Sequence, residues 1–281
     1  MADARPTPHR LRIDAGGVHL AGLVVLPVTA VRGALLVCHG AGSRKENHVI
    51  MAEQAAAAGL ASLVFDFRGH GESDGVMDHE AGHDVPAAAA ALRAAADPPW
   101  LAARGSSLGA YWLLRAAQAE PDTFRSLVLL CPADEHSLLS GLDRFAGWTP
   151  AGQAGPRTTA LDAPTLHTPA LDIPALDTPP GMPPRLSAAG AGSPHGRFDV
   201  PRLRALWQST DIFRSASGLQ RVLLAHARND EDVPFSVSER LLTALSPPRR
   251  LIALPRGGHK AAQRSPLVAQ ATIEWTLDHG R

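Results

Sequence analysis

The chain has 281 residues, enough to bury a large hydrophobic core, and α/β proteins of this size commonly form one domain. Lys plus Arg and Asp plus Glu both number 27, which gives a formal net charge of zero. This balance, without a basic block, argues against nucleic acid or an anionic membrane as a main partner. Residues 1–12 lack the apolar core of a signal peptide and no segment is apolar enough for a membrane span, so we expect a cytoplasmic protein.

The two cysteines, Cys38 and Cys131, both end apolar runs that are typical of buried strands. We expect buried free thiols rather than a disulfide, and such thiols fit a reducing cytoplasm.

Strand-like and helix-like segments alternate along the chain. The first two predicted strands, 11–14 and 18–26, are joined by a Gly-Gly turn and predict a hairpin. The further strands are expected at 34–38, 61–65, 100–103, 126–130, 221–225 and 249–254, and the helices between them at 46–58, 84–96, 108–120, 235–245 and 263–279. This alternation predicts an α/β fold with a mostly parallel, doubly wound sheet, whose ligands bind at the C-terminal ends of the strands.

The segment from about 148 to 197 interrupts this alternation. It holds ten of the 24 prolines and three near-copies of one pentapeptide, at 160–164, 170–174 and 175–179. Dense prolines prevent a helix and remove the donors that a sheet needs. We therefore expect a low-complexity, extended insertion rather than an ordered lid.

The segments on either side of this insertion, 135–145 and 200–215, are expected to form amphipathic helices that cover the site as a small cap. The predicted organisation is a first part of the core at 1–134, a cap region with the insertion at 135–218, and a second part of the core at 219–281.

A Gly-x-Ser-x-Gly pentapeptide at 105–109 has Ser107 at its centre, between the predicted strand 100–103 and the predicted helix 108–120. A serine in a sharp strand-to-helix turn has strained backbone angles, and the close backbone approach favours residues without bulk two before and two after it. The helix N-terminus favours negative charge nearby, and the N–H of Leu108 is expected to be one donor of an oxyanion hole. Ser107 is therefore the predicted nucleophile.

A second match to the pentapeptide, at 71–75 with Ser73 at its centre, follows a predicted strand through a polar turn but leads into more loop. Because the context of a nucleophile is strand, turn and helix, Ser107 is favoured over Ser73.

A serine hydroxyl needs a base, and the base needs a group that orients it. His259 follows the predicted strand 249–254 through a loop that contains Gly257 and Gly258, at the same sheet edge as Ser107, and is the predicted base. The predicted acid is Asp230, in the loop after the preceding strand. Asp232 and Asp134 remain alternatives.

The chain resembles the α/β-hydrolase family over nearly all its length except the Pro-rich segment. The resemblance rests on His-Gly at 39–40, Asp-Phe-Arg-Gly-His-Gly-Glu-Ser at 66–73, the pentapeptide at 105–109, the segment 226–234 and Gly-His at 258–259. Ala227 departs from the family's usual glycine. The resemblance implies Ser107 as nucleophile, Asp230 as acid and His259 as base, in the family's order.

The resemblance also implies that the N–H of Ala41 is the second donor of the oxyanion hole, and that His39 and His70 brace their loops rather than catalyse. The implied activity is hydrolysis of a carboxylic ester, or a related acyl compound, with a small-molecule substrate and without cofactor or metal. Thioesterase, amidase, peptidase and acyltransferase chemistry use the same residues, and the sequence does not indicate an oligomeric state.

Two other functions compete with this interpretation. The sequence His-Glu-Ala-Gly-His at 79–83 matches the zinc-peptidase signature, which requires a helix through these residues. Pro86 disfavours a helix that continues from 79–83. It favours a helix that begins after this segment, with Asp84 as its N-cap and Pro86 in its first turn. The histidines would then lie in a loop. The other alternative is a binding protein that keeps this fold without catalysis.

Overall fold

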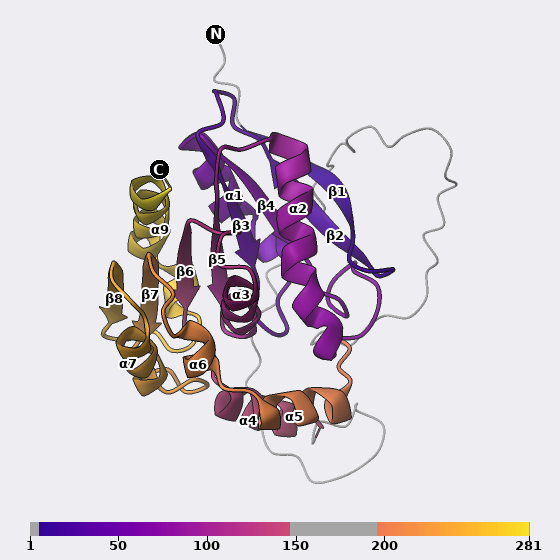
Figure 1. Ribbon diagram of the computed structural model, residues 1–281, viewed down its shortest axis with the longest axis vertical. Coiled ribbons are helices and arrows are strands. Elements are labelled where there is room, and N and C mark those ends of the chain that lie inside the picture. The colour runs from indigo at the N-terminus through magenta and orange to yellow at the C-terminus, as the bar shows by residue number, and fades with distance from the viewer. Residues whose placement is uncertain (1–5, 147–195, 281) are drawn as a thin grey trace.

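The computed structural model describes residues 6–146 and 196–280 (Figure 1). The predicted insertion lies outside these residues except at its last two positions, and the predicted division into core and cap parts is not tested by the fold. In the described part of the chain, no helix combines the length and apolarity that crossing a membrane requires.

One sheet of eight strands organises the described residues. The strands run in the order β1-β2-β4-β3-β5-β6-β7-β8; β1 and β2 pair antiparallel, as do β2 and β4, and the other neighbours are parallel. This confirms the predicted α/β class with a mostly parallel, doubly wound sheet. Their bounds are β1 Pro8–Asp14, β2 His19–Val25, β3 Gly33–Cys38, β4 Leu60–Phe65, β5 Leu101–Ser106, β6 Ser126–Leu130, β7 Val222–Ala227 and β8 Arg249–Leu254.

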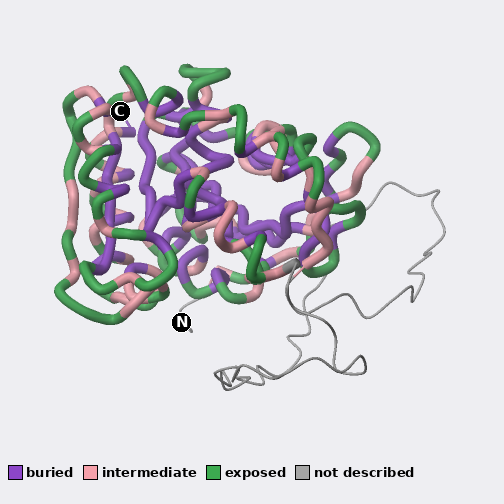
Figure 2. Tube along the Cα trace, turned by 90° about the horizontal axis from the view of Figure 1, so that it is seen from below, coloured by how far each residue is buried: buried purple, intermediate pink, exposed green. Residues whose placement is uncertain are grey.

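Helices cover both faces of this sheet, as parallel strands require. α1 and α9 share a hydrophobic cluster on one face, while α2, α3 and α7 share the larger cluster on the other. Figure 2 shows the buried centre of the molecule, and the strands β3, β4, β5, β6 and β7 are buried along their whole length. The helices are η1 Lys45–His48, α1 Val49–Ala57, η2 His79–His83, α2 Asp84–Ala96, α3 Leu108–Ala119, α4 Glu135–Ala146, α5 Val200–Ser209, α6 Ile212–Ala216, α7 Phe235–Ala244, α8 Ala261–Arg264 and α9 Pro266–His279.

The helices α4 and α5 lie side by side across one end of the sheet in Figure 1. α4 follows β6, so this is the end at which the parallel strands terminate. Leu138 and Leu142 of α4 and Leu203 and Trp207 of α5 are buried in the larger hydrophobic cluster. The segments on either side of the predicted insertion therefore pack over the C-terminal edge of the sheet.

Three predicted helices differ from the structure by more than one residue at an end or are divided in two. The predicted helix 200–215 is two helices, because the Asp211 carboxylate accepts the N–H groups of Phe213 and Arg214 and starts α6. The predicted helix 263–279 is likewise divided into two helices, α8 and α9, because Ser265 caps α9 and a proline is the first residue of α9. The predicted helix 46–58 begins instead with the 3₁₀ turn η1.

The prediction that Asp84 caps α2 is wrong. Asp84 is the first residue of the helix itself, and its buried carboxylate accepts the backbone N–H of Arg68 at 2.9 Å and the Arg68 Nε–H at 2.8 Å. The carboxylate is unavailable as a cap because the nearly buried guanidinium of Arg68 needs an anionic partner. The predicted bounds of this helix, 84–96, are confirmed.

Two central strands extend further than predicted. β5 continues through Arg104 to Ser106 and pairs with β3 and β6, and β7 includes His226 and Ala227, which were expected in the following loop. In both cases the hydrogen-bond ladder of a buried strand overrides the weak strand propensity of its polar or small residues.

The close packing of α3 against β3 generates a stability prediction. A Cβ atom on Gly109 would lie 2.4 Å from the backbone oxygen of His39 and 2.5 Å from that of Cys38, so we expect Gly109→Ala to destabilise the protein by about 1–3 kcal/mol. Gly141 on α4 has only an Arg144 side-chain nitrogen nearby, so Gly141→Ala should stabilise by about 0.5–1 kcal/mol. Urea unfolding measures both variants, and equal midpoints would contradict the close approach.

Candidate active site

Ser107 lies between the end of β5 and the start of α3, with φ 51° and ψ −118°. This positive φ is strained for a residue with a side chain. A Cβ on Gly105 would lie 2.7 Å from the Gly109 carbonyl oxygen, and Gly109 itself packs against β3. The two glycines of the pentapeptide are thus required by the close approach of backbone on both sides of the serine.

Backbone hydrogen bonds hold the strained serine against the end of the neighbouring strand β6. The Ser107 N–H donates to the Leu130 carbonyl at 2.9 Å, and the Ser107 carbonyl accepts from Ala133 at 3.4 Å and from the N–H groups of Ala110 and Tyr111 in α3. The conformation of Ser107 is therefore fixed by contacts outside its own turn.

Asp230 and His259 form a direct pair. The His259 Nδ1 lies 2.8 Å from Asp230 Oδ2 and 3.1 Å from Oδ1, and the carboxylate is fully buried while the imidazole is 15% exposed. Because a buried carboxylate accepts hydrogen bonds, this contact assigns the imidazole proton to Nδ1 and leaves the Nε2 lone pair free for a second proton.

Three further donors surround the Asp230 carboxylate. His226 of β7 places Nε2 3.0 Å from Oδ2, and the N–H groups of Asp232 and Val233 each donate to Oδ1 at 2.9 Å. The His226 Nδ1 lies 2.7 Å from the hydroxyl of Ser238, which fixes the ring from its other side. The carboxylate is therefore held in place by its own loop, by β7 and by α7.

These contacts shift both ionisation equilibria. Burial opposes ionisation of Asp230, but the hydrogen bonds from His226, His259 and Val233 outweigh it and hold the pKa of the carboxyl well below its usual range. Burial likewise disfavours the imidazolium of His259, but the hydrogen bond to Asp230 and the nearby Cys131 outweigh it and raise the His259 pKa above its ordinary value. The carboxylate thus stabilises the protonated imidazole of His259.

Cys131 connects this pair to the serine. Its Sγ–H donates to the His259 carbonyl at 3.3 Å, and Cys131 directly follows Leu130, whose carbonyl accepts from Ser107. The strands β5, β6, β7 and β8 are successive neighbours in the sheet, so Ser107, Cys131, Asp230 and His259 follow the C-terminal ends of four adjacent strands. This order explains why residues far apart in sequence meet at one edge.

Asp134 and Asp232, the alternatives for the acid, and Ser73, the alternative for the nucleophile, make other contacts. Asp134 starts α4, where its carboxylate accepts the N–H and the hydroxyl of Ser137 at 2.9 and 2.6 Å. Asp232 is 45% exposed and pairs with Arg144 at 3.0 Å. The hydroxyl of Ser73 is buried, donates to the Asp66 carbonyl at 2.6 Å and so braces a turn.

The loop after β3 lies against the serine. A Cβ on Gly40 would be 3.3 Å from the Ser107 Cβ, and no described residue accepts a hydrogen bond from the N–H of Ala41 or Leu108. Buried His39 fixes this loop, because its Nδ1–H donates to the Gly40 carbonyl at 2.8 Å and its Nε2 accepts from the N–H of Phe67 at 3.1 Å. Two backbone donors are thus available beside Ser107.

His79 and His83 lie in the 3₁₀ helix η2, not in the loop that the sequence predicts. Both rings are largely exposed, and their Nε2 atoms lie 3.0 and 3.3 Å from the carboxylate of Glu80. A 3₁₀ turn does not set residues four apart on one face, so this segment lacks the geometry of the zinc-peptidase helix.

Sequence reasoning missed the parts played by His226 and Cys131. His226 and Asp230 are four positions apart, but β7 ends between them, so neither a helix period nor a strand period predicts their contact. Cys131 was assigned only as a buried thiol, and its contact with His259 spans 128 positions. Such a contact follows from sheet order and carries no local signal in the sequence.

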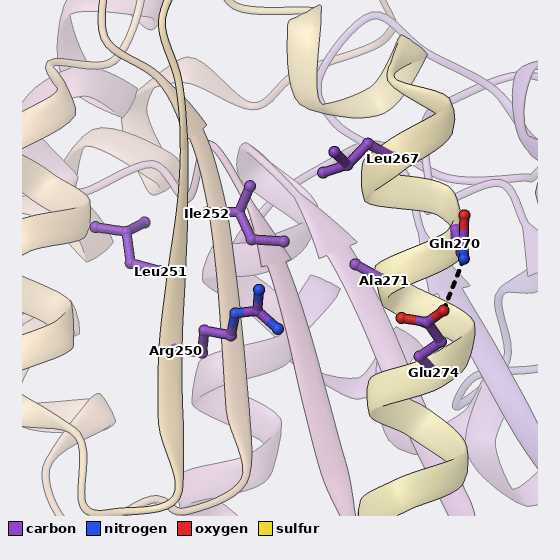
Figure 3. Close-up of a pocket in the computed structure, with 7 residues that line it drawn as sticks. All are labelled: Arg250, Leu251, Ile252, Leu267, Gln270, Ala271 and Glu274. Carbon is purple, nitrogen blue, oxygen red and sulfur yellow. Dashed lines mark hydrogen bonds between the residues drawn. The ribbon is translucent and has the colours of Figure 1, made fainter.

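A groove of about 450 Å³ lies away from this cluster, along the outer edge of the sheet. Figure 3 shows the side chains that line it, from β8 and α9, with Gln270 and Glu274 hydrogen-bonded to each other. The lining residues are Arg250, Leu251, Ile252, Leu267, Gln270, Ala271 and Glu274. Ser107, Asp230 and His259 are not among the residues that line this groove.

Comparison with known proteins gives one family and several similar folds. The sequence model of the alpha/beta hydrolase fold matches residues 33–262. No curated protein matches the chain by sequence. Est1E from Butyrivibrio proteoclasticus, solved with ferulic acid bound, is 20% identical with a TM-score of 0.68, over 96% of this chain and 98% of that one. The esterase domain of a Rhodothermus marinus protein is 20% identical with a TM-score of 0.66, over 97% and 99%. The dienelactone hydrolase of Anabaena variabilis is 19% identical with a TM-score of 0.59, over 99% and 100%.

The Asp230–His259 pair generates a prediction that is independent of activity. We expect Asp230→Asn to lower the pKa of the His259 imidazole, because the amide no longer stabilises the imidazolium. Asp232→Asn is the matched control and should leave this pKa unchanged. NMR titration of histidine-labelled protein, with His259 assigned from a His259→Gln spectrum, measures it. An equal fall in both aspartate variants would contradict the assignment of Asp230.

Proposed function

Because the chain belongs to the alpha/beta hydrolase fold family, we propose that it is a serine hydrolase that cleaves carboxylic esters or related acyl compounds through an acyl-enzyme on Ser107. The observation that carries this proposal is the buried Asp230–His259 pair at the same sheet edge as a serine with strained backbone angles. A base oriented by a carboxylate and a nucleophile on a helix N-terminus are the parts that acyl transfer needs.

In the first step the Nε2 of His259 takes the proton of Ser107 as the serine oxygen attacks the ester carbonyl. Asp230 keeps the proton on Nδ1 and stabilises the imidazolium that forms. The negative charge that develops on the carbonyl oxygen is stabilised by the N–H groups of Ala41 and Leu108, each worth about 3 kcal/mol of barrier. The tetrahedral intermediate then collapses, and the imidazolium returns its proton to the leaving alcohol.

In the second step water replaces the alcohol. His259 takes a proton from the water, whose oxygen attacks the acyl-enzyme carbonyl, and the second tetrahedral intermediate forms against the same two N–H groups. Its collapse breaks the bond to the Ser107 oxygen, which regains its proton from His259. The products are the acid and the free enzyme, and the chemistry uses only groups of this chain and water.

The proposed substrate is a small-molecule ester. One of the similar structures is an esterase domain and another holds ferulic acid, a carboxylic acid, which supports esters before amides as the first class to test. The helices α4 and α5 lie across the end of the sheet where the substrate would bind and are therefore expected to set acyl-chain preference. Rates on p-nitrophenyl esters of graded acyl length, beside thioester and amide analogues, test the class and separate esterase from thioesterase, amidase and acyltransferase activity.

The buried free thiols of Cys38 and Cys131 fit a reducing compartment, and we propose that the enzyme works in the cytoplasm.

The first functional prediction concerns the nucleophile. Ser107→Ala should lower kcat on p-nitrophenyl acetate by about four to six orders of magnitude and abolish labelling by a fluorophosphonate, because no covalent intermediate can form. Ser106→Ala is the matched control, since the neighbouring hydroxyl is buried and has no described hydrogen-bond partner. Retained turnover and labelling in Ser107→Ala would refute the mechanism, and a wild-type chain that neither labels nor turns over would favour the binding protein.

The second functional prediction concerns the oxyanion hole. Ala41→Pro removes the N–H donor and should lower kcat by about 100- to 1,000-fold with a much smaller change in KM. Ala41→Gly keeps the N–H and is the matched control, and thermal unfolding checks that both variants fold. A folded Ala41→Pro enzyme with wild-type kcat would show that this N–H does not stabilise the transition state.

A further inference from the structure

We propose that Cys131, Asp230 and His259 form a binding site for a thiophilic divalent cation such as Zn²⁺, and that the bound cation blocks the proposed hydrolase. A thiol sulfur, a carboxylate oxygen and an imidazole nitrogen from these residues all lie within 4.8 Å of one another. Among the described residues this is the one such group of three potential ligands. The regulatory part of the inference rests on the proposed function, while the binding site itself does not.

The three donors match the coordination chemistry of zinc. Zn²⁺ binds thiolate, imidazole and carboxylate at about 2.0–2.3 Å in tetrahedral geometry, so three ligand atoms around one ion lie roughly 3–4 Å apart. In the structure the His259 Nδ1 and the Asp230 Oδ2 lie 2.8 Å apart and all three donor atoms lie within 4.8 Å of one another, so small side-chain shifts bring them around one ion. Three protein ligands leave a fourth position for water or another small ligand. Thiolate also selects against Mg²⁺ and Ca²⁺, which prefer oxygen ligands.

The ligands come from three loops that other contacts already hold in place. Cys131 follows β6 with φ 37°, Asp230 is fixed by two backbone N–H groups of its own loop, and His259 is tied to both. The Cys131 and Asp230 side chains are buried, whereas the His259 imidazole is 15% exposed and gives the cation a route to the cluster. Little ordering of the chain is therefore required on binding.

Binding exchanges a proton for the metal. Zn²⁺ displaces the proton of the Cys131 thiol, which passes to solvent, and the sulfur then donates to the metal instead of hydrogen-bonding to the His259 carbonyl. The Asp230 carboxylate binds through an oxygen lone pair, and His259 binds as the neutral imidazole, so a protonated ring first releases one proton to solvent. A cation at Nδ1 leaves the remaining ring proton on Nε2, and a cation at Nε2 leaves it on Nδ1. No oxidation or reduction takes place, and the process is reversed by a chelator.

A cation at this site stops the proposed reaction whichever ring nitrogen it takes. Binding to Nδ1 replaces the hydrogen bond to Asp230 that orients the base, and binding to Nε2 occupies the lone pair that removes the serine proton. The thiol of Cys131 thus makes the hydrolase sensitive to zinc, although Cys131 has no part in the proposed acyl transfer.

Binding is tested first in the Ser107→Ala background, so that the outcome does not depend on turnover. Titration calorimetry with Zn²⁺ should show one site per chain, and Cys131→Ser in the same background should bind at least about 100-fold more weakly. Cys38→Ser is the matched control, because Cys38 is equally buried but ends β3 and lies outside the cluster, and it should bind as the parent does. Absence of a site in the parent, or equal affinity in Cys131→Ser, overturns the proposal.

Cobalt absorption provides a second measurement that does not rely on the Cys131→Ser variant folding. Co²⁺ added to the Ser107→Ala, Cys38→Ser protein should produce the near-ultraviolet charge-transfer band of a cobalt–thiolate bond, and Zn²⁺ should remove it. Because Cys131 is then the remaining cysteine, the band assigns the ligand, and bound Co²⁺ without the band overturns the site.

Inhibition is then measured with Ser107 restored. Zn²⁺ should inhibit ester hydrolysis by the wild-type and Cys38→Ser proteins, and EDTA should restore the activity. For each protein, inhibition is measured against its own rate without metal. On this scale, Cys131→Ser should need a Zn²⁺ concentration at least about 100-fold higher for the same inhibition. Inhibition unchanged in Cys131→Ser overturns the regulatory role. A protein that binds Zn²⁺ but has no hydrolase activity refutes the proposed function and keeps the metal site.

Discussion

The buried carboxylate of Asp230 is the constraint on which the site depends. An isolated charge would be costly at this depth, and the protein offsets the cost with donors from His226, His259 and two backbone N–H groups. Each donor comes from a segment that must be placed correctly for the charge to be stable. Because all these donors bind one carboxylate, the end of β7, the loop that follows it and the loop after β8 hold fixed positions relative to one another. The same hydrogen bonds orient the His259 imidazole.

The sheet order supplies the rest of the arrangement. The neighbouring strands β3, β5, β6, β7 and β8 end at one edge, and each is followed by a residue or loop of the site. Side by side they present the Ala41 N–H after β3, Ser107 and the Leu108 N–H after β5, Cys131 after β6, the Asp230 carboxylate after β7 and the His259 imidazole after β8. Because parallel strands share one direction, pairing them in this order brings these groups to one edge of the sheet.

Much of this was predictable because the signals were local. The glycines around Ser107, the apolar run of β3 and the alternation of strands and helices each depend on neighbouring residues, and the bounds of β8 agree with the sequence prediction. The failures depend on partners far along the chain. Asp84 follows a cap pattern but binds Arg68, and His226 lies in β7 because it pairs with Ala253 of β8. In both cases the local structure depends on a contact with a residue distant in sequence, and the sequence alone does not identify that residue.

The loop that carries Ala41 is fixed by a second buried carboxylate, on the other side of the serine. Asp66, after β4, accepts the Lys45 N–H and Nζ at 2.7 Å each, and the Glu72 N–H at 3.0 Å. Removing one partner of such a buried pair costs about 3–5 kcal/mol, so the loop cannot drift without losing it. Backbone donors stabilise a developing charge only when they are already aimed. The Asp230–His259 pair is thus held from β7, and the loop with Ala41 is held by Asp66 after β4. Ser107, which follows β5 between them in the sheet order, is held by its own backbone hydrogen bonds.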